Sequence, residues 1–347
     1  LASGKTVALK ADGTVEAVAS VAQGVGAESV FESAQSDIVT ATFDSNSNKV
    51  VIAYADAGNS SYGTAVVGTV SGTSISFGTP VVFENALTQN ISITFDSTAN
   101  KVVIAYTDYG NSSYGTGIVG TVSGTSISFG TAAVFNSGTT GYISTTYDST
   151  NNRVVIVYQD NTPYAYGDGT AIVATVSGTS ISFGTAVVFQ TTQPSYNSAT
   201  YDSTNNKVVI GYRDAGNSYY GTAVVGTVSG TSISFGTAVV FNSASTFYSS
   251  ATFDSAANKV LIAYRDAGNS DYGTAIVGTV SGTSISFGDE TVFNTATTYY
   301  NAATYDSTNN KVVIAYSDVG NSNYGTAVVF TIGSTNLSAT TFLGITS

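Results

Sequence analysis

The chain has 347 residues, of which 36 are Gly, 23 Tyr and 17 Phe, and it contains no Cys, Met, Trp or His. It therefore has no disulfide, no thiolate or imidazole metal ligand and no imidazole base. Its net charge is −12, and a surface with only ten Lys and Arg argues against a nucleic-acid partner, because phosphates require a basic footprint. No stretch approaches the roughly 18 apolar residues of a membrane span, so no membrane insertion is expected.

Near the N-terminus, residues 4–18 form two short alternating segments around Asp12-Gly13. Such a turn between alternating segments is a strong hairpin signal. We expect residues 1–20 to be an accessory β-hairpin that attaches the chain to other proteins.

A sequence segment of about fifty residues is then repeated six times. Successive starts are 52, 52, 54, 52 and 52 residues apart, at Phe43, Phe95, Tyr147, Tyr201, Phe253 and Tyr305. A period in this range is typical of solenoids, propellers and arrays, whose units bury a core only together. Phe31 aligns with the end of a repeat. Residues 24–31 therefore correspond to the last part of a repeat whose first part lies elsewhere in the chain.

Each repeat predicts four strands, in keeping with the abundance of β-branched and aromatic residues. Strand A, as in residues 198–202, precedes an Asp-Ser turn, and strand B, as in residues 311–316, is apolar enough to be buried on both faces. A DAGNS-type loop leads to strand C. Strand D, SISFGTAVVF, contains a central Gly that suggests a bulge or bend.

Four antiparallel strands repeated six times predict an all-β fold, a six-bladed β-propeller over residues 21–333. The last repeat lacks a strand D, and residues 24–31 are the missing strand, so strands from both termini would close the ring and remove its exposed edges. The alternative is an open stack of β units. Residues 334–347 form a C-terminal tail that could pair with the hairpin and lead into a further domain.

The DAGNS loops resemble the Asp-box turns of sialidase-like propellers. We expect the Asp to accept backbone N–H groups, the Gly to take a positive φ and the Ser hydroxyl to close the turn. The functional alternative is calcium, which favours oxygen ligands. The third copy is longer and has two carboxylates, Asp160 and Asp168, so these are the candidate metal ligands. The main prediction is a structural turn, with no metal and no cofactor.

Catalytic arrangements are missing from the sequence. The Asp residues of the DS turns, such as Asp202, are explained by turn capping, and the five Glu are scattered without the paired spacing of a glycosidase. Ser and Thr have no histidine base, and the three Arg do not form the cluster that a sialidase needs. We expect no enzymatic activity.

The copies differ from one another mainly in the segment between strand D and the next strand A, and at points in the B–C loops. In a propeller both connections emerge on one face. The sequence differences among the copies are therefore expected to gather on one rim, above strands that hardly change. Exposed Tyr beside Asn, Gln and Ser suits sugar faces or protein epitopes; the alternative is unconstrained drift. The candidate ligand-binding residues are Tyr142, Tyr196, Tyr248, Tyr300, Arg213, Arg265, Tyr109 and Tyr219.

The phrases VSGTSISFGTAVVF and YDSTNNKVVIAYRDAGNSxYGTA, with VALKADGTVEAV and ATTFLGITS at the ends, resemble repeat propeller proteins of tailed-phage tail fibres and related bacterial surface proteins. The resemblance implies a virion or extracellular location and attachment to a host cell-surface glycan or protein. Other virion or appendage proteins would bind through the termini, and the chain would be one piece of a longer fibre protein. The alternatives are a purely structural decoration propeller and a calcium-binding, non-catalytic sialidase-like lectin.

Overall fold

The structure is a computed structural model that describes residues 7–9, 15–17, 28–162 and 167–333. Strands β1 (Val7–Leu9) and β2 (Val15–Ala17) pair antiparallel, with Val7 opposite Ala17, which is the hairpin that the sequence predicts. Its Asp12-Gly13 turn and the tail at 334–347 lie outside the described residues. Pairing between the hairpin and the tail therefore stays a prediction.

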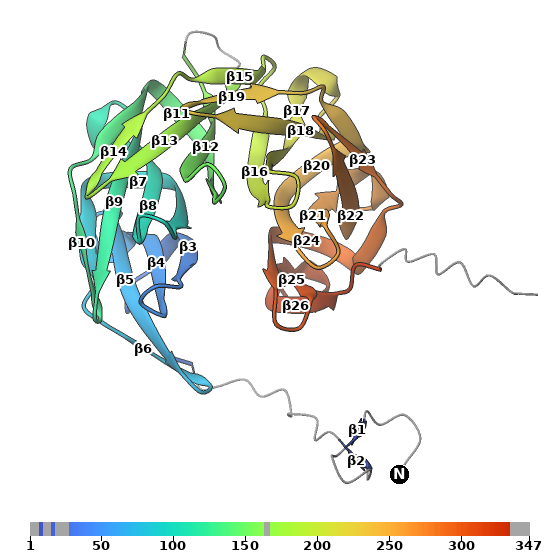
Figure 1. The fold of residues 1–347 in the computed structure, drawn as a ribbon, viewed down its shortest axis with the longest axis horizontal. Coiled ribbons are helices and arrows are strands. Elements are labelled where there is room, and N and C mark those ends of the chain that lie inside the picture. The colour runs from blue at the N-terminus through green and yellow to red at the C-terminus, as the bar shows by residue number, and fades with distance from the viewer. Residues whose placement is uncertain (1–6, 10–14, 18–27, 163–166, 334–347) are drawn as a thin grey trace, which may run out of the picture.

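Six antiparallel units follow, each made from one repeat and arranged along an arc (Figure 1). We name them units 1 to 6 and keep the letters A to D for their strands. Unit 1 comprises β3 (Ser36–Asp44), β4 (Lys49–Asp56), β5 (Tyr62–Ser71), β6 (Ser74–Phe77) and the beginning of β7 (Val81–Asp96). Unit 2 comprises the rest of β7, β8 (Lys101–Asp108), β9 (Tyr114–Ser123), β10 (Ser126–Phe129) and the beginning of β11 (Ala133–Asp148). Unit 3 comprises the rest of β11, β12 (Arg153–Asp160), β13 (Asp168–Ser177), β14 (Ser180–Phe183) and β15 (Val187–Gln190).

The second half of the arc repeats the arrangement. Unit 4 comprises β16 (Ser195–Asp202), β17 (Lys207–Asp214), β18 (Tyr220–Ser229), β19 (Ser232–Phe235) and the beginning of β20 (Val239–Asp254). Unit 5 comprises the rest of β20, β21 (Lys259–Asp266), β22 (Tyr272–Ser281), β23 (Ser284–Phe287) and the beginning of β24 (Thr291–Asp306). Unit 6 comprises the rest of β24, β25 (Lys311–Asp318) and β26 (Tyr324–Phe330).

Five single-turn 3₁₀ helices occupy B–C loops, and no helix in the described part of the chain is long and apolar enough to cross a membrane. They are η1 (Ala57–Asn59), η2 (Tyr109–Asn111), η3 (Ala215–Asn217), η4 (Ala267–Asn269) and η5 (Val319–Asn321).

Strand D is split in two at its central glycine, as the sequence suggested. In unit 1, Phe77 pairs with Gly68 on β5 before the break, and Val81 pairs with Ala65 after it. A Cβ on Gly78 would lie 1.8 Å from the carbonyl oxygen of Thr125 in unit 2. The glycine is therefore required because the backbone of the next unit approaches closely.

Four of the five connections from strand D to the next strand A are continuous strands, which corrects the expectation of loops there, whereas residues 191–194 between β15 and β16 form no strand. β7, β11, β20 and β24 are each 16 residues long; their first halves pair within one unit and their second halves within the next. The register shifts between Gln89 and Ser92 on β7, which marks a β-bulge. The two ends of β7 pair with strands of different units, so the chain crosses between them without a loop.

Strand B carries the packing between units. On β8, Val102, Ile104 and Tyr106 belong to the apolar cluster shared with unit 1, whereas Val103 and Ala105 belong to the one shared with unit 3. All five side chains are fully buried, which confirms the prediction of burial on both faces. Burying one such aliphatic side chain stabilises the fold by about 1.5–3 kcal/mol.

Polar side chains also link neighbouring units. The carboxylate of Asp202 accepts hydrogen bonds from the backbone N–H groups of Thr204 at 3.0 Å and Asn205 at 2.9 Å, so the predicted turn capping is confirmed. Tyr201 Oη, in unit 4, donates to Thr150 Oγ1 of unit 3 at 2.6 Å. The DS turns thus join the units as well as ending the hairpins.

The DAGNS turn is confirmed for the Asp of units 2, 4, 5 and 6, whereas Asp56 of unit 1 caps no backbone N–H of a described residue, and the prediction is corrected for the Gly and Ser. Asp266 Oδ1 accepts a hydrogen bond from Gly268 N at 2.9 Å. The positive φ of 56° belongs to Ser270, whose contribution is backbone conformation. Gly268 lies in the 3₁₀ turn, where an added Cβ would come within 2.4 Å of Ala244 Cβ. The glycine is needed for close packing, not for a left-handed conformation.

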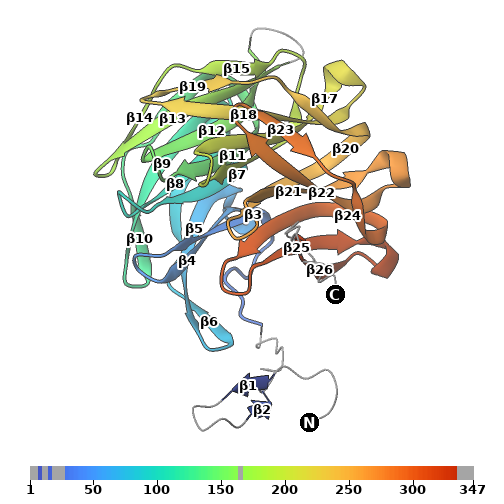
Figure 2. The ribbon, with the colours of Figure 1, turned by 45° about the vertical axis from the view of Figure 1, so that its right-hand side comes forward.

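The closed ring of six four-stranded blades is not confirmed. Among the described residues β26 pairs only with β25, residues 28–35 form no strand, and 18–27 lie outside the description. Figure 1 shows a gap between unit 1 and unit 6, and Figure 2 shows the same arc turned by 45°. Phe43 of unit 1 is 54% exposed and Val329 of unit 6 is 58% exposed. The all-β, antiparallel architecture is confirmed.

The contact between Gly268 and Ala244 gives a stability prediction. Gly268→Ala forces two Cβ atoms together and lowers the free energy of unfolding by about 1–3 kcal/mol, measured by urea titration. Adding Ala244→Gly removes the opposing Cβ and recovers most of the loss. A double variant as unstable as Gly268→Ala would contradict this account of the loop.

Candidate functional site

Bulges on the A strands place one side chain of each unit toward the centre of the arc. The bulged residues have positive φ values of 48–55°, and they are Ile38, Asn90, Tyr142, Tyr196, Tyr248 and Tyr300. A strands of neighbouring units are hydrogen-bonded through serine: Ser92 Oγ accepts from Thr145 N at 3.0 Å and Ser198 Oγ from Ala251 N at 2.8 Å. The bulged residues therefore lie next to one another along the inner side of the arc.

Four of these residues form a continuous row of aromatic rings, which we call the tyrosine array. Ring centroids are 5.4 Å apart between Tyr142 and Tyr196, 5.0 Å between Tyr196 and Tyr248, and 5.2 Å between Tyr248 and Tyr300. Burial raises the pKa of Tyr142 and of Tyr248 above the ordinary tyrosine range, and neighbouring tyrosines add to it. These phenols are uncharged at neutral pH and offer flat apolar faces with polar tips.

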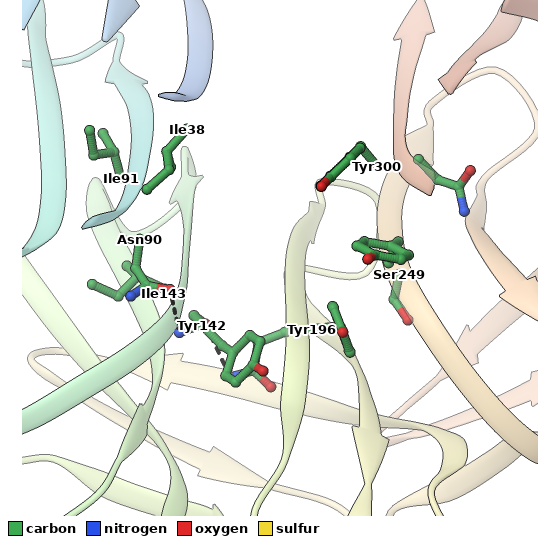
Figure 3. A pocket seen from close by; sticks show the side chains of 11 residues that line it. Ile38, Asn90, Ile91, Tyr142, Ile143, Tyr196, Ser249 and Tyr300 are labelled. Carbon is green, nitrogen blue, oxygen red and sulfur yellow. Dashed lines mark hydrogen bonds between the residues drawn. The ribbon is translucent and has the colours of Figure 1, made fainter. Parts of the chain in front are cut away.

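A cavity of about 380 Å³ lies along the array and has two unlike sides. Ile91 and Ile143 line it in units 2 and 3, and Asn197, Ser249 and Asn301 line it in units 4 to 6. Figure 3 shows Ile91 and Ile143 on one side, Ser249 and Tyr300 on the other, and Tyr142 and Tyr196 between them. The cavity can therefore contact one apolar and one polar side of a ligand.

The polar side contains buried atoms without hydrogen-bond partners. Among the residues that the structure describes, Asn197 Oδ1, Ser249 Oγ and both side-chain polar atoms of Asn301 have none, although Asn197 Nδ2 donates to the carbonyl oxygen of Tyr142 at 3.2 Å. Asn197 is only 9% exposed. Leaving such an atom unpaired costs about 1–3 kcal/mol, so these atoms are suited to hydrogen-bond a polar ligand.

Two arginines lie between aromatic rings beside the array. Arg213 Cζ is 4.1 Å from the ring centroid of Tyr219 and 4.4 Å from that of Phe247. Arg265 Cζ is 4.1 Å from the ring centroid of Phe247 and 5.0 Å from that of Tyr299. The ring of Phe247 is thus shared by two cations of neighbouring units, and each guanidinium gains cation–π stabilisation.

A second cavity, of about 250 Å³, lies at the boundary of units 3 and 4, and we call it the arginine pocket. It is lined by Tyr142, Gln159, Gln193, Ser195, Arg213, Ala215 and Tyr219. Tyr142 belongs to both cavities. Burial lowers the pKa of Arg213, and the tyrosines around it act in the opposite direction.

The structure brings together seven of the eight residues predicted as a binding rim. The array holds Tyr142, Tyr196, Tyr248 and Tyr300, and Arg213, Tyr219 and Arg265 lie beside it. Tyr109 is apart from them, with its hydroxyl donating to Gln89 Oε1 at 3.0 Å. Whether these residues bind a ligand stays a prediction.

The candidate metal ligands lie opposite each other on neighbouring strands of unit 3, and Asp160 already has a structural role. Asp160 is opposite Asp168 in the register of β12 and β13, and its Oδ1 accepts hydrogen bonds from Asn136 Nδ2 and Thr162 N, both at 3.0 Å. In the described part of the chain, no group of three or more carboxylates could hold a metal ion. Calcium binding by this loop remains untested.

Sequence reasoning missed the residues on either side of the bulged position. Phe247 and Tyr299 precede it and cover the arginines, and Asn197, Ser249 and Asn301 follow it and line the cavity. The sequence signal that indicates these positions is the difference in residue type among the copies. The residue after the bulge changes from Ile in units 2 and 3 to Asn or Ser in units 4 to 6.

No family model and no curated protein matches the chain. Solved structures do resemble it. The BP39L lectin from Burkholderia pseudomallei has a TM-score of 0.61 at 9% identity, covering 84% of this chain and 81% of that one. A triple arginine-to-alanine mutant of AofleA from Arthrobotrys oligospora has a TM-score of 0.54 at 8% identity, covering 86% and 84%. These likenesses show that the fold is propeller-like, with repeated antiparallel blades.

The shared ring of Phe247 gives a prediction for the arginine row. Phe247→Leu keeps an apolar side chain but removes the π face between two guanidinium groups, which lowers the free energy of unfolding by about 1–2 kcal/mol. In a background of Arg213→Gln and Arg265→Gln, the same substitution has a much smaller effect. Equal losses in both backgrounds would show that the ring contributes only by its apolar packing.

Proposed function

We propose that the protein is a non-enzymatic carbohydrate-binding module that recognises a cell-surface glycan through the tyrosine array and its surrounding cavities. The observation that carries this proposal is the row of four tyrosine rings along a cavity whose polar side has unpaired buried atoms. A sugar ring has an apolar face, which suits tyrosine, and hydroxyl groups, which suit Asn and Ser. The resemblance in fold to a lectin supports the same function.

The setting that we propose is a phage tail fibre or a similar surface appendage, on a virion or at an extracellular surface. The repeat phrases and terminal segments support this setting. Several copies on one appendage would convert shallow contacts into firm attachment through avidity. The hairpin and the C-terminal tail would then join the module to neighbouring appendage proteins.

We propose that the functional architecture is a closed ring of six four-stranded blades. Phe31 packs against Tyr54 at 5.2 Å and Phe77 at 5.8 Å, the same contacts that Phe83 makes one repeat later with Tyr106 and Phe129. Residues just before Phe31 would then pair with β26 as the missing strand D. Closure would cover the exposed Phe43 and Val329, and it would place Ile38 next to Tyr300 around one central cavity.

Catalysis is not expected. Candidate nucleophiles have no imidazole base in a chain without histidine. The carboxylates of the Asp turns accept hydrogen bonds from their own loops, as Asp202 and Asp266 do. These carboxylates therefore stabilise backbone turns.

The test is glycan-array and whole-cell binding by the full chain and by a variant with Tyr142, Tyr196, Tyr248 and Tyr300 changed to Ala. We expect binding to fall about tenfold or more, equivalent to about 1.4 kcal/mol, because the apolar faces that contact the sugar are gone. Tyr324→Ala is the matched control, since Tyr324 is exposed outside the array. Circular dichroism and the melting temperature confirm that both variants fold.

Three outcomes are possible for folded proteins. Loss of binding only in the array variant supports the proposal. Binding that survives in the array variant moves the site elsewhere on the protein. Absence of binding by the unaltered chain to every glycan and cell tested favours the alternative of a structural decoration module.

A further inference from the structure

The charge on Arg213 has no protein counter-ion among the described residues. In the next repeat Arg265 has Asp271, whose Oδ1 lies 3.4 Å from Arg265 Nε. The position equivalent to Asp271 is Tyr219 in unit 4, which covers the face of Arg213 without neutralising it. The groups that influence the pKa of Arg213 are three tyrosines and Arg265, with no carboxylate among them.

Two residues that line the arginine pocket have an unpaired hydrogen-bond donor. Within the described part of the chain, Arg213 Nε and Gln159 Nε2 are buried without an acceptor, and Gln159 is only 4% exposed. The N–H groups of a guanidinium point in its own plane, so Arg213 can form new hydrogen bonds at its edge while the rings of Tyr219 and Phe247 lie 4.1 and 4.4 Å from Cζ. Arginine in this geometry matches a planar, acceptor-only group, and the biological group of that kind with a full charge is a carboxylate.

The remaining walls suit a sugar ring. Tyr142 and Tyr219 present aromatic surface, and Gln193 and Ser195 add polar groups. The cavity of about 250 Å³ is open at the surface and of a size for a single saccharide unit. We infer that the arginine pocket binds an acidic sugar, a pyranose carrying a carboxylate, whose carboxylate pairs with Arg213 and Gln159. The inference rests on the proposed function, since it names the saccharide class for one part of the same surface.

The net charge of −12 opposes an anionic ligand at long range but does not remove the contact. Charges separated by more than about 8 Å are largely screened at physiological ionic strength. The Arg213 guanidinium, in contrast, acts at hydrogen-bond distance in a partly desolvated site, where a charge-assisted hydrogen bond is strongest.

The experiment compares each acidic sugar with its uncharged counterpart. The probes are the methyl glycosides of glucuronic, galacturonic and N-acetylneuraminic acid, each beside its carboxamide, which has the same shape without the charge. Binding to the full chain is measured by saturation-transfer NMR and calorimetry. We expect at least one acid to bind about tenfold or more tightly than its carboxamide.

Two variants test the role of Arg213, and one serves as the control. Arg213→Gln removes the charge and abolishes the preference for the acid. Tyr219→Asp places a carboxylate where unit 5 has Asp271, so it neutralises Arg213 by a pairing that the fold already accepts, and it also abolishes the preference. Arg153→Gln removes a cation that lies outside the pocket and the array, where its Nε donates to the carbonyl oxygen of Gly230 at 2.9 Å, and the preference survives.

The outcomes separate this inference from the proposed function. A preference for the acid that disappears in Arg213→Gln and in Tyr219→Asp supports the inference. Equal binding of acid and carboxamide, or a preference that persists in both variants, overturns it while leaving the proposed function standing. If no saccharide binds the unaltered chain on arrays or in solution, both fail.

Discussion

The interaction on which the structure depends is the packing of B strands against both neighbouring units. Alternate side chains of β8 enter two different apolar clusters, with Ile104 on one side and Val103 on the other. A single unit would leave both faces in water, so a repeat of about fifty residues is stable only between two others. The same dependence makes the exposed faces of units 1 and 6 energetically unfavourable, and this supports closure of the ring.

The binding surface follows from that constraint. The B strands hardly vary among copies because each side chain is fixed by two neighbours, whereas the bulged residues on the A strands point into a shared cavity and are free to differ. Units 2 and 3 place Asn90 and Tyr142 there beside isoleucines, and units 4 to 6 place tyrosines beside Asn and Ser. One scaffold thus presents different surroundings at equivalent positions, and the exchange of Asp271 for Tyr219 leaves Arg213 without the carboxylate that Arg265 has.

Much of the fold could be predicted from the sequence because it depends on local patterns repeated six times. The apolar run of strand B predicted burial on both faces, and the turn aspartates predicted the caps that Asp202 and Asp266 make. The bulges could not be predicted, since a positive φ at Tyr142 or Tyr196 is imposed by pairing on both sides, against the preference of a bulky residue. The D–A connection was predicted as a loop because the pairing of its two ends with different units cannot be read from the sequence. The cluster of tyrosines and arginines was found because the copies differ there, but its place on inner strands depends on tertiary packing.

The most direct test of the account is a disulfide between residues that only ring closure brings together. Thr64 pairs with Val82 in unit 1, and the equivalent residues at the junction of the termini are Thr326 and Val30. We expect Val30→Cys with Thr326→Cys to form an intramolecular disulfide on mild oxidation, seen as a mobility shift without reductant, because paired strands bring Cα atoms within bonding range. Thr274→Cys with Val292→Cys, which are already paired, is the positive control, and Val30→Cys with Thr274→Cys is the negative one. A Val30–Thr326 pair that stays reduced, or that links only separate molecules, would contradict the closed ring.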